Sequence, residues 1–164
     1  MAALAAAVLG TAAVGTAACR DVTAPAQDPT TVTYSPKLAI RLSDYTKDTS
    51  GVYYRDVAVG SGTLAAPKST LTYYYTGFLA DGRQFDTNVG GVARSLVLGR
   101  GDVIRGFDRG LVGIRAGGRR YLIIPPALGY GNTSLQTAIP AGSVLLFQID
   151  VPSVTLDTTT TKTS

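Results

Sequence analysis

Short apolar segments separated by Gly and Pro fill the middle of the chain, and they are rich in Val, Ile, Leu, Tyr and Thr. This composition is typical of strands joined by turns. The clearest alternation lies in residues 145–151, where every second side chain is large and apolar while Gln148 and Asp150 point to the opposite face. The pattern predicts strands over residues 52–59, 70–79, 94–98, 119–124 and 143–151.

One segment has the three- and four-residue spacing of apolar positions that indicates a helix. It begins at Asp102, and Gly106 and Gly110 would let the helix lie close against a sheet. The apolar residues that define it are Val103, Ile104, Phe107, Leu111 and Ile114. The expected fold is therefore α+β, an antiparallel β-sheet of about five strands curled around one short α-helix.

The first residues are typical of an export signal, because residues 1–18 carry no charge and consist mainly of Ala, Val, Leu, Gly and Thr. Thr16, Ala17 and Ala18 precede Cys19, the only Cys of the chain, and resemble a bacterial lipobox in which the Cys is lipidated. Thr16 departs from the usual Leu, and no Lys or Arg precedes the apolar stretch. We expect a lipoprotein of the bacterial envelope, anchored through Cys19 and facing the periplasm or the cell exterior. An Ala-rich helix of a cytosolic protein is the alternative.

The remaining boundaries follow from composition. Residues 19–36 contain Pro among Thr, Ala, Asp and Gln, which predicts a flexible tether. Residues 157–164 are mostly Thr and Ser, which predicts a disordered tail. The folded domain is expected over residues 37–156.

The composition excludes several chemistries, because the chain has no His, no Trp and one Cys. His is the usual general base near neutral pH, and zinc sites and C-x-x-C redox motifs need His or paired Cys. Catalysis by a carboxylate, Tyr, Lys or geometry alone remains, as does binding alone, and no metal site is expected. Asp86 and Asp102 could form a glycosidase pair, but no local feature raises either pKa and no Trp would bind a sugar.

The charge does not indicate a nucleic-acid partner. Fifteen Lys and Arg against eleven Asp and Glu give a net charge of +4, but the basic residues are scattered. Arg119 and Arg120 form the longest basic run, so there is no basic stripe.

Four motifs occur in order between residues 75 and 131. They are Tyr75-Thr76-Gly77, Gly82-Arg83-Gln84-Phe85-Asp86, the run from Leu98 to Phe107 (LGRGDVIRGF) and the run from Pro125 to Gly131 (PPALGYG). Through these motifs and the spacing between them, residues 51–151 resemble an FKBP-type peptidyl-prolyl cis/trans isomerase.

The resemblance implies a shallow apolar pocket that binds X-Pro segments of polypeptides, needs no cofactor and takes macrolide inhibitors. It makes Phe107 the aromatic floor, and it makes the Ile104 N–H and the Tyr130 hydroxyl hydrogen-bond donors. The catalytic residues that it implies are Asp86, Ile104 and Tyr130, and the substrate-binding residues are Tyr75, Phe85, Val103, Phe107, Leu135 and Phe147.

Four positions depart from the family pattern. Arg94 stands where an aromatic residue commonly closes one pocket wall, and Gly91 stands where an Arg often pairs with the pocket Asp. Phe107 replaces a frequent Trp, and Leu135 replaces an occasional His. We hypothesise that Arg94 supplies the cation facing Asp86.

The expected protein is a monomeric, exported isomerase acting on X-Pro bonds of proteins that fold outside the cytoplasm, with a lipid anchor to the membrane. One alternative is a chaperone module of the same fold that holds Pro-containing segments with little turnover. Another is a structural lipoprotein of the envelope with a vestigial pocket.

Overall fold

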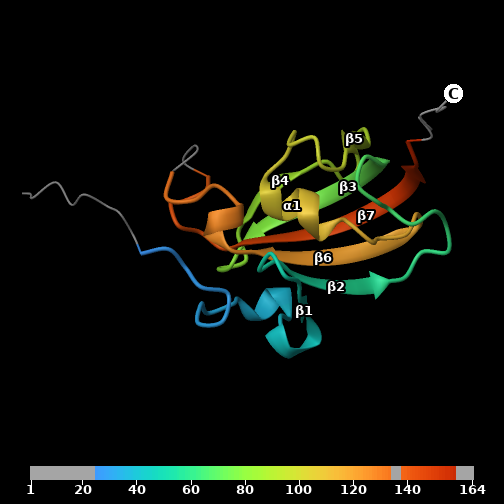
Figure 1. Cartoon of the computed structure of the whole chain (residues 1–164). Coiled ribbons are helices and arrows are strands. Elements are labelled where there is room, and N and C mark those ends of the chain that lie inside the picture. The colour runs from blue at the N-terminus through green and yellow to red at the C-terminus, as the bar shows by residue number, and fades with distance from the viewer. Residues whose placement is uncertain (1–24, 134–137, 158–164) are drawn as a thin grey trace, which may run out of the picture.

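The computed structural model describes residues 25–133 and 138–157, which form one antiparallel sheet with a short helix on one face (Figure 1). The strand order is β1-β2-β6-β7-β3-β4, and β5 pairs with β3. The strands are β1 (Thr46–Lys47), β2 (Tyr53–Ala58), β3 (Thr70–Leu79), β4 (Gln84–Thr87), β5 (Arg94–Val97), β6 (Gly118–Ile124) and β7 (Leu145–Thr155). The helices are α1 (Arg105–Gly110) and the 3-10 turns η1 (Pro36–Leu38), η2 (Leu42–Asp44) and η3 (Pro126–Leu128).

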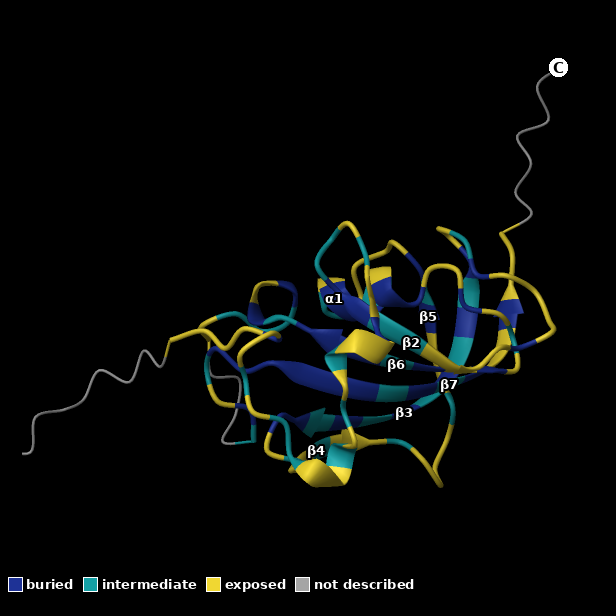
Figure 2. Ribbon diagram, turned by 90° about the horizontal axis from the view of Figure 1, so that it is seen from below, coloured by how far each residue is buried: buried dark blue, intermediate teal, exposed yellow. Residues whose placement is uncertain are grey.

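The α+β fold predicted from the sequence is confirmed. All five predicted strands occur, and the sheet also contains β1 and β4, which the pattern does not predict. β1 has two residues, and β4 has four exposed or half-buried residues, so neither shows a clear alternation. β7 lies between β6 and β3 at the centre of the sheet. Its alternate residues Leu145, Phe147 and Ile149 are buried in the main core. Figure 2 shows the buried parts of the chain, in dark blue, gathered along the sheet strands.

The helix is shorter than the spacing predicts, because α1 has only six residues, Arg105–Gly110. Ile104 precedes it with an extended backbone, φ −57° and ψ 143°, and Gly113 follows it at φ +79°. The apolar residues at both ends therefore belong to turns that pack on the core. Gly106 and Gly110 allow the expected close approach: a Cβ at these positions would lie 2.3 Å from Ile124 and 2.7 Å from Leu122 of β6.

The second face of the sheet is also covered, by the N-terminal segment drawn in blue to cyan in Figure 1. Val32 and Tyr34 pack against a cluster that includes Ile123 and Leu146. The Gln27 N–H donates to the Gly142 carbonyl at 2.7 Å. The prediction of a flexible tether over 19–36 is therefore wrong for residues 25–36, because sparse apolar side chains and backbone hydrogen bonds hold this stretch on the sheet.

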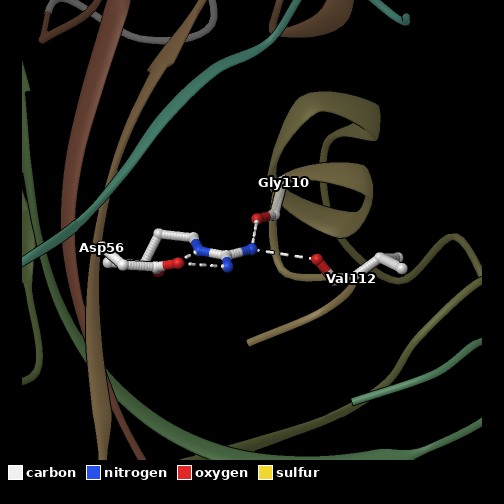
Figure 3. A network of polar contacts seen from close by, with 4 residues as sticks. Asp56, Gly110 and Val112 are labelled. Carbon is white, nitrogen blue, oxygen red and sulfur yellow. Dashed lines mark hydrogen bonds and ion pairs between the residues drawn. The ribbon is translucent and has the colours of Figure 1, made fainter. Parts of the chain in front are cut away.

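Buried Arg120 of β6 ties α1 to the sheet (Figure 3). Its guanidinium donates to both carboxylate oxygens of Asp56, at 2.6 and 2.9 Å, and to the carbonyls of Gly110 and Val112, each at 2.9 Å. The Gly110 carbonyl belongs to the last turn of α1, where carbonyls lack partners within the helix. Neighbouring Arg119 points to the other face and pairs with exposed Asp150 at 2.7 Å. The two adjacent arginines thus form separate ion pairs on opposite faces.

Candidate functional site

A cavity of about 330 Å³ lies between α1 and strands β3, β4, β5 and β7. The turn before α1 supplies one wall and the segment after η3 supplies another. The residues that line it are Tyr73, Tyr75, Asp86, Arg94, Asp102, Val103, Ile104, Phe107, Tyr130 and Phe147.

Aromatic rings form the floor of this cavity. The Phe107 ring of α1 lies edge-on to Phe147 of β7, with 5.2 Å between ring centroids. Tyr73 lies 5.3 Å and Tyr75 lies 6.0 Å from Phe107. Both tyrosines point to the same face of β3 because side chains alternate along a strand, while half-buried Tyr74 points to the other face. The floor is therefore a rigid apolar surface built from three elements.

Two hydrogen-bond donors beside the floor have no partner within the described part of the chain. The Ile104 N–H precedes α1, and no hydrogen bond between described residues uses it. The same holds for the Tyr130 hydroxyl, which follows η3. Both residues are half-buried and line the apolar cavity, so a ligand seated there can accept a hydrogen bond from each donor.

The Tyr75 hydroxyl donates a short hydrogen bond to Asp86 Oδ2. Burial raises the pKa of Tyr75, and the hydrogen bond and negative charge of Asp86 raise it further, against a smaller opposing effect of Arg94. Tyr75 therefore remains a neutral donor at any physiological pH. Asp86 Oδ1 accepts a second hydrogen bond from the Thr87 N–H at 2.8 Å.

Arg94 does not pair with Asp86, so the hypothesis of an ion pair between them is wrong. The Arg94 guanidinium lies over the ring of Tyr75, 5.3 Å from its centroid. No ion pair in the described chain includes Arg94, and Asp86 accepts from the hydroxyl of the same Tyr75. The two charged groups thus contact different parts of Tyr75, Arg94 the face of the ring and Asp86 the hydroxyl.

Asn88 organises the loop between β4 and β5 and is a residue that the motifs do not indicate. Its Oδ1 accepts from the Tyr75 N–H at 2.7 Å, and its Nδ2 donates to the carbonyls of Tyr73 and Val92 at 3.2 and 3.1 Å. These bonds fix the loop to β3. The sequence signal for this role is that Asn88, a residue type common in turns, shortly precedes Gly90 and Gly91.

The structure brings together most of the residues predicted for the site. Tyr75, Asp86, Val103, Ile104, Phe107, Tyr130 and Phe147 all line the cavity. Phe85 does not line it and packs edge-on against Phe147 at 5.6 Å, in space left by the missing side chain of Gly77. Leu135 and Cys19 lie outside the described residues. Tyr73 and Asp102 line the cavity without having been predicted as site residues, although the spacing places Tyr73 on the face of Tyr75. Arg94 also lines the cavity, at the wall position that the departures from the family pattern gave it.

Residues 25–133 and 138–157 contain no group of three His, Cys, Asp or Glu side chains placed to hold a metal ion. Within the same residues, no helix is long and apolar enough to cross a membrane.

Comparison with known proteins gives a consistent family assignment. Residues 62–152 match the model of the FKBP-type peptidyl-prolyl cis-trans isomerase family. FK506-binding protein 3 of Candida albicans is 42% identical over 104 residues, which are 63% of this chain and 24% of that protein. FK506-binding protein 4 of Rhizopus delemar is 38% identical over 109 residues, 66% of this chain and 28% of that protein. The chain thus spans about a quarter of the length of these relatives.

Solved structures agree with the sequence matches. The crystal structure of FkpA from Escherichia coli superposes with a TM-score of 0.63 at 32% identity, covering 74% of this chain and 55% of that one. The crystal structure of AtFKBP13 gives a TM-score of 0.61 at 32% identity, covering 66% of this chain and 97% of that one.

Proposed function

Because the chain belongs to the FKBP-type peptidyl-prolyl cis-trans isomerase family, we propose that its aromatic cavity accelerates rotation about X-Pro bonds of polypeptides. The observation that carries the proposal is the pair of unpartnered donors, the Ile104 N–H and the Tyr130 hydroxyl, beside the ring of Phe107. A proline ring needs an apolar surface, and the carbonyls on either side of it need donors. The cavity offers both.

The physical basis lies in the amide bond itself. Resonance keeps the amide planar, with a rotation barrier of about 18 to 20 kcal/mol, and makes its carbonyl strongly polar. Rotation breaks the resonance, so the twisted amide is less polar than the planar one. A cavity with little water therefore destabilises the planar state more than the twisted state. A thousandfold acceleration needs only about 4 kcal/mol of such differential stabilisation.

Each side chain has a role in this proposal. Phe107 receives the proline ring, and the Ile104 N–H and Tyr130 hydroxyl hold substrate carbonyls so that the bond between them can twist. Asp86 acts by accepting the hydrogen bond of the Tyr75 hydroxyl, which keeps this ring of the aromatic floor in place. Val103 and Phe147 exclude water, and no step requires proton transfer or a cofactor.

The direct test is isomerisation of a short peptide that contains one X-Pro bond, followed by exchange NMR spectroscopy. We expect the Tyr130→Phe variant to lose several-fold in kcat/KM, because one hydrogen bond is removed without changing the shape of the cavity. Tyr121→Phe is the matched control, since half-buried Tyr121 packs on the other face of the sheet. Absence of turnover by the wild-type domain would overturn the proposal. A chaperone module with little turnover would show peptide binding alone, but the family comparisons do not favour it.

We also propose that macrolides occupy the same cavity, on the support of the relatives named FK506-binding proteins. The domain is proposed to act as a monomer. Competition of FK506 with an X-Pro peptide, together with sedimentation of the free and bound protein, tests both statements.

We propose further that residues 1–18 direct export and that Cys19 carries a lipid anchor to the membrane of a bacterial envelope. The support is the uncharged, Ala-rich sequence that ends before the only Cys of the chain. One relative, from Spodoptera frugiperda, is named a nuclear protein, so location must be measured directly. The Cys19→Ser variant should move from the membrane fraction to the soluble fraction, and equal membrane association of both forms would contradict the anchor.

A further inference from the structure

Arg94 projects into the cavity from a fixed position. It begins β5 and lies directly opposite Tyr73 in the register with β3, so its side chain shares the face of Tyr73 and Tyr75. Its guanidinium lies over the Tyr75 ring, 5.3 Å from the centroid. The hydrogen bond from Tyr75 to Asp86 holds that ring, and Asn88 fixes the loop before β5.

The guanidinium of Arg94 has no carboxylate partner in the described chain, although two carboxylates also line the cavity. Asp102 already forms an ion pair with Arg100, with 2.6 Å between Asp102 Oδ2 and Arg100 Nε. Asp86 accepts hydrogen bonds from the Tyr75 hydroxyl and the Thr87 N–H, and it forms no ion pair with Arg94. The cavity wall therefore presents an unpaired cation whose planar set of donors fits a carboxylate.

Arg94 lies against the aromatic floor, because its guanidinium is 5.3 Å from the centroid of Tyr75, and that centroid is 6.0 Å from the centroid of Phe107. Successive Cα atoms of a peptide are about 3.8 Å apart. With a proline ring on Phe107, a long side chain next to the proline can therefore reach Arg94.

We propose that Arg94 is a specificity residue, which makes the domain prefer X-Pro segments with Asp or Glu next to the proline. The inference rests on the proposed isomerase function and adds the class of substrate. The unpaired guanidinium forms an ion pair with the substrate carboxylate. The contact is open to water, so it is weakened by salt.

The test compares kcat/KM for peptides that differ only in the residue next to proline, which is Glu, Gln or Lys, placed before the proline in one series and after it in another. In at least one series, kcat/KM for the Glu peptide should be about two- to fivefold higher than for the Gln peptide, which is the range expected for an exposed ion pair. The ratio should fall toward one at high salt. Arg94→Gln should abolish the preference, and Arg94→Glu should transfer it to the Lys peptide.

Arg109→Gln is the matched control, because Arg109 is an exposed residue of α1 outside the cavity, and this variant should keep the wild-type ratio. Turnover of the Gln peptide tests the isomerase function by itself, whereas the Glu to Gln ratio tests Arg94. Calorimetry of the same peptides gives the Glu to Gln ratio of binding affinities even if no turnover occurs. Equal Glu and Gln values in both series, or a preference of the wild type for Lys, would overturn the proposal.

Discussion

Phe107 belongs both to the core of the domain and to the floor of the cavity. Its side chain is 4% exposed, and its ring contacts the rings of Phe147 and Tyr73. Aromatic pairs of this kind add to the stability that comes from burial. A substitution at Phe107 therefore affects the fold and the cavity together, and the two effects must be measured separately.

Replacing Phe107 with Ala should lower the free energy of unfolding by about 3 to 5 kcal/mol, as for other buried Phe residues. It should also reduce peptide turnover under conditions where the variant is fully folded, because the proline ring loses its floor. Urea denaturation measures the first effect and exchange NMR the second. Phe78→Ala is the control, since Phe78 packs on the opposite face and should lower stability alone. Wild-type turnover by folded Phe107→Ala would contradict the role of the floor.

The wall of the cavity shows how far individual residues could be predicted from the sequence. Alternation alone places Tyr73 and Tyr75 on one face of β3, as observed. The position of Arg94 depends on its register opposite Tyr73, which is set by the length of the β4–β5 loop and by the hydrogen bonds of Asn88. Such contacts between side chain and backbone leave no periodic pattern, so the contact of Arg94 with the Tyr75 ring could not be foreseen.

At the scale of single elements, α1 depends on contacts from the sheet. Six residues are too few for a stable isolated helix. Its glycines let it lie against β6, and Arg120 binds the carbonyl of its last residue. Since α1 carries Phe107 and follows Ile104, the Arg120 network also keeps the cavity in shape.

Arg120→Met should lower the free energy of unfolding by about 1 to 3 kcal/mol, because it leaves two carbonyls and the 32% exposed side chain of Asp56 without their donor. Arg120→Lys should cost less, since it keeps the charge but loses the paired geometry. Arg119→Met is the control on the neighbouring residue: its exposed pair with Asp150 is worth at most about 1 kcal/mol. Urea denaturation of the three variants gives the comparison. Equal losses for the two Met variants would show that the Arg120 network adds nothing beyond a surface pair.

The predicted helix has the right position in the chain, but it is longer than α1. Periodicity detects which side chains face the core, and those of Val103, Leu111 and Ile114 do pack there. It does not detect backbone conformation. Ile104 is extended and Gly113 has a positive φ, so the same apolar residues lie on turns. The short helix leaves the Ile104 N–H outside the helix, where it is available to a ligand.

At the scale of the whole molecule, the sheet is covered on both faces. α1 and the turns around it cover one face, and the segment from Val32 to Tyr45 covers the other. The composition predicted a tether over part of this segment because its apolar residues are few and Pro is frequent. Each of these few apolar side chains adds little to stability by itself. Their packing on β6 and β7 depends on tertiary contacts, which composition cannot reveal.

Covering both faces also affects stability at high pH. Burial raises the pKa of Tyr34, Tyr73 and Tyr75, and it raises the pKa of Tyr45 to about 12. An unfolded Tyr ionises near pH 10. Between these values the unfolded chain loses protons that the folded chain retains, so stability is complete below about pH 10 and falls as the pH rises further.

Unfolding by urea across this range should therefore show a plateau up to about pH 10 and a decline above it. Tyr45→Phe keeps the apolar ring and removes one ionising hydroxyl, so its stability should decline less steeply. The wild-type protein measured in parallel is the reference. Identical slopes for the two proteins would show that Tyr45 does not contribute to the alkaline transition.

The central position of β7 has a consequence for synthesis. Residues 145–155 form the last strand of the described part of the chain, but they lie between β6 and β3 and pair with both. Until a ribosome has released this segment, β3 and β6 have no common neighbour, and the apolar face beneath α1 remains open. Folding must therefore follow the translation of residue 155. A nascent chain that stalls before β7 would expose the same aromatic residues that line the finished cavity, and would depend on chaperones to avoid aggregation.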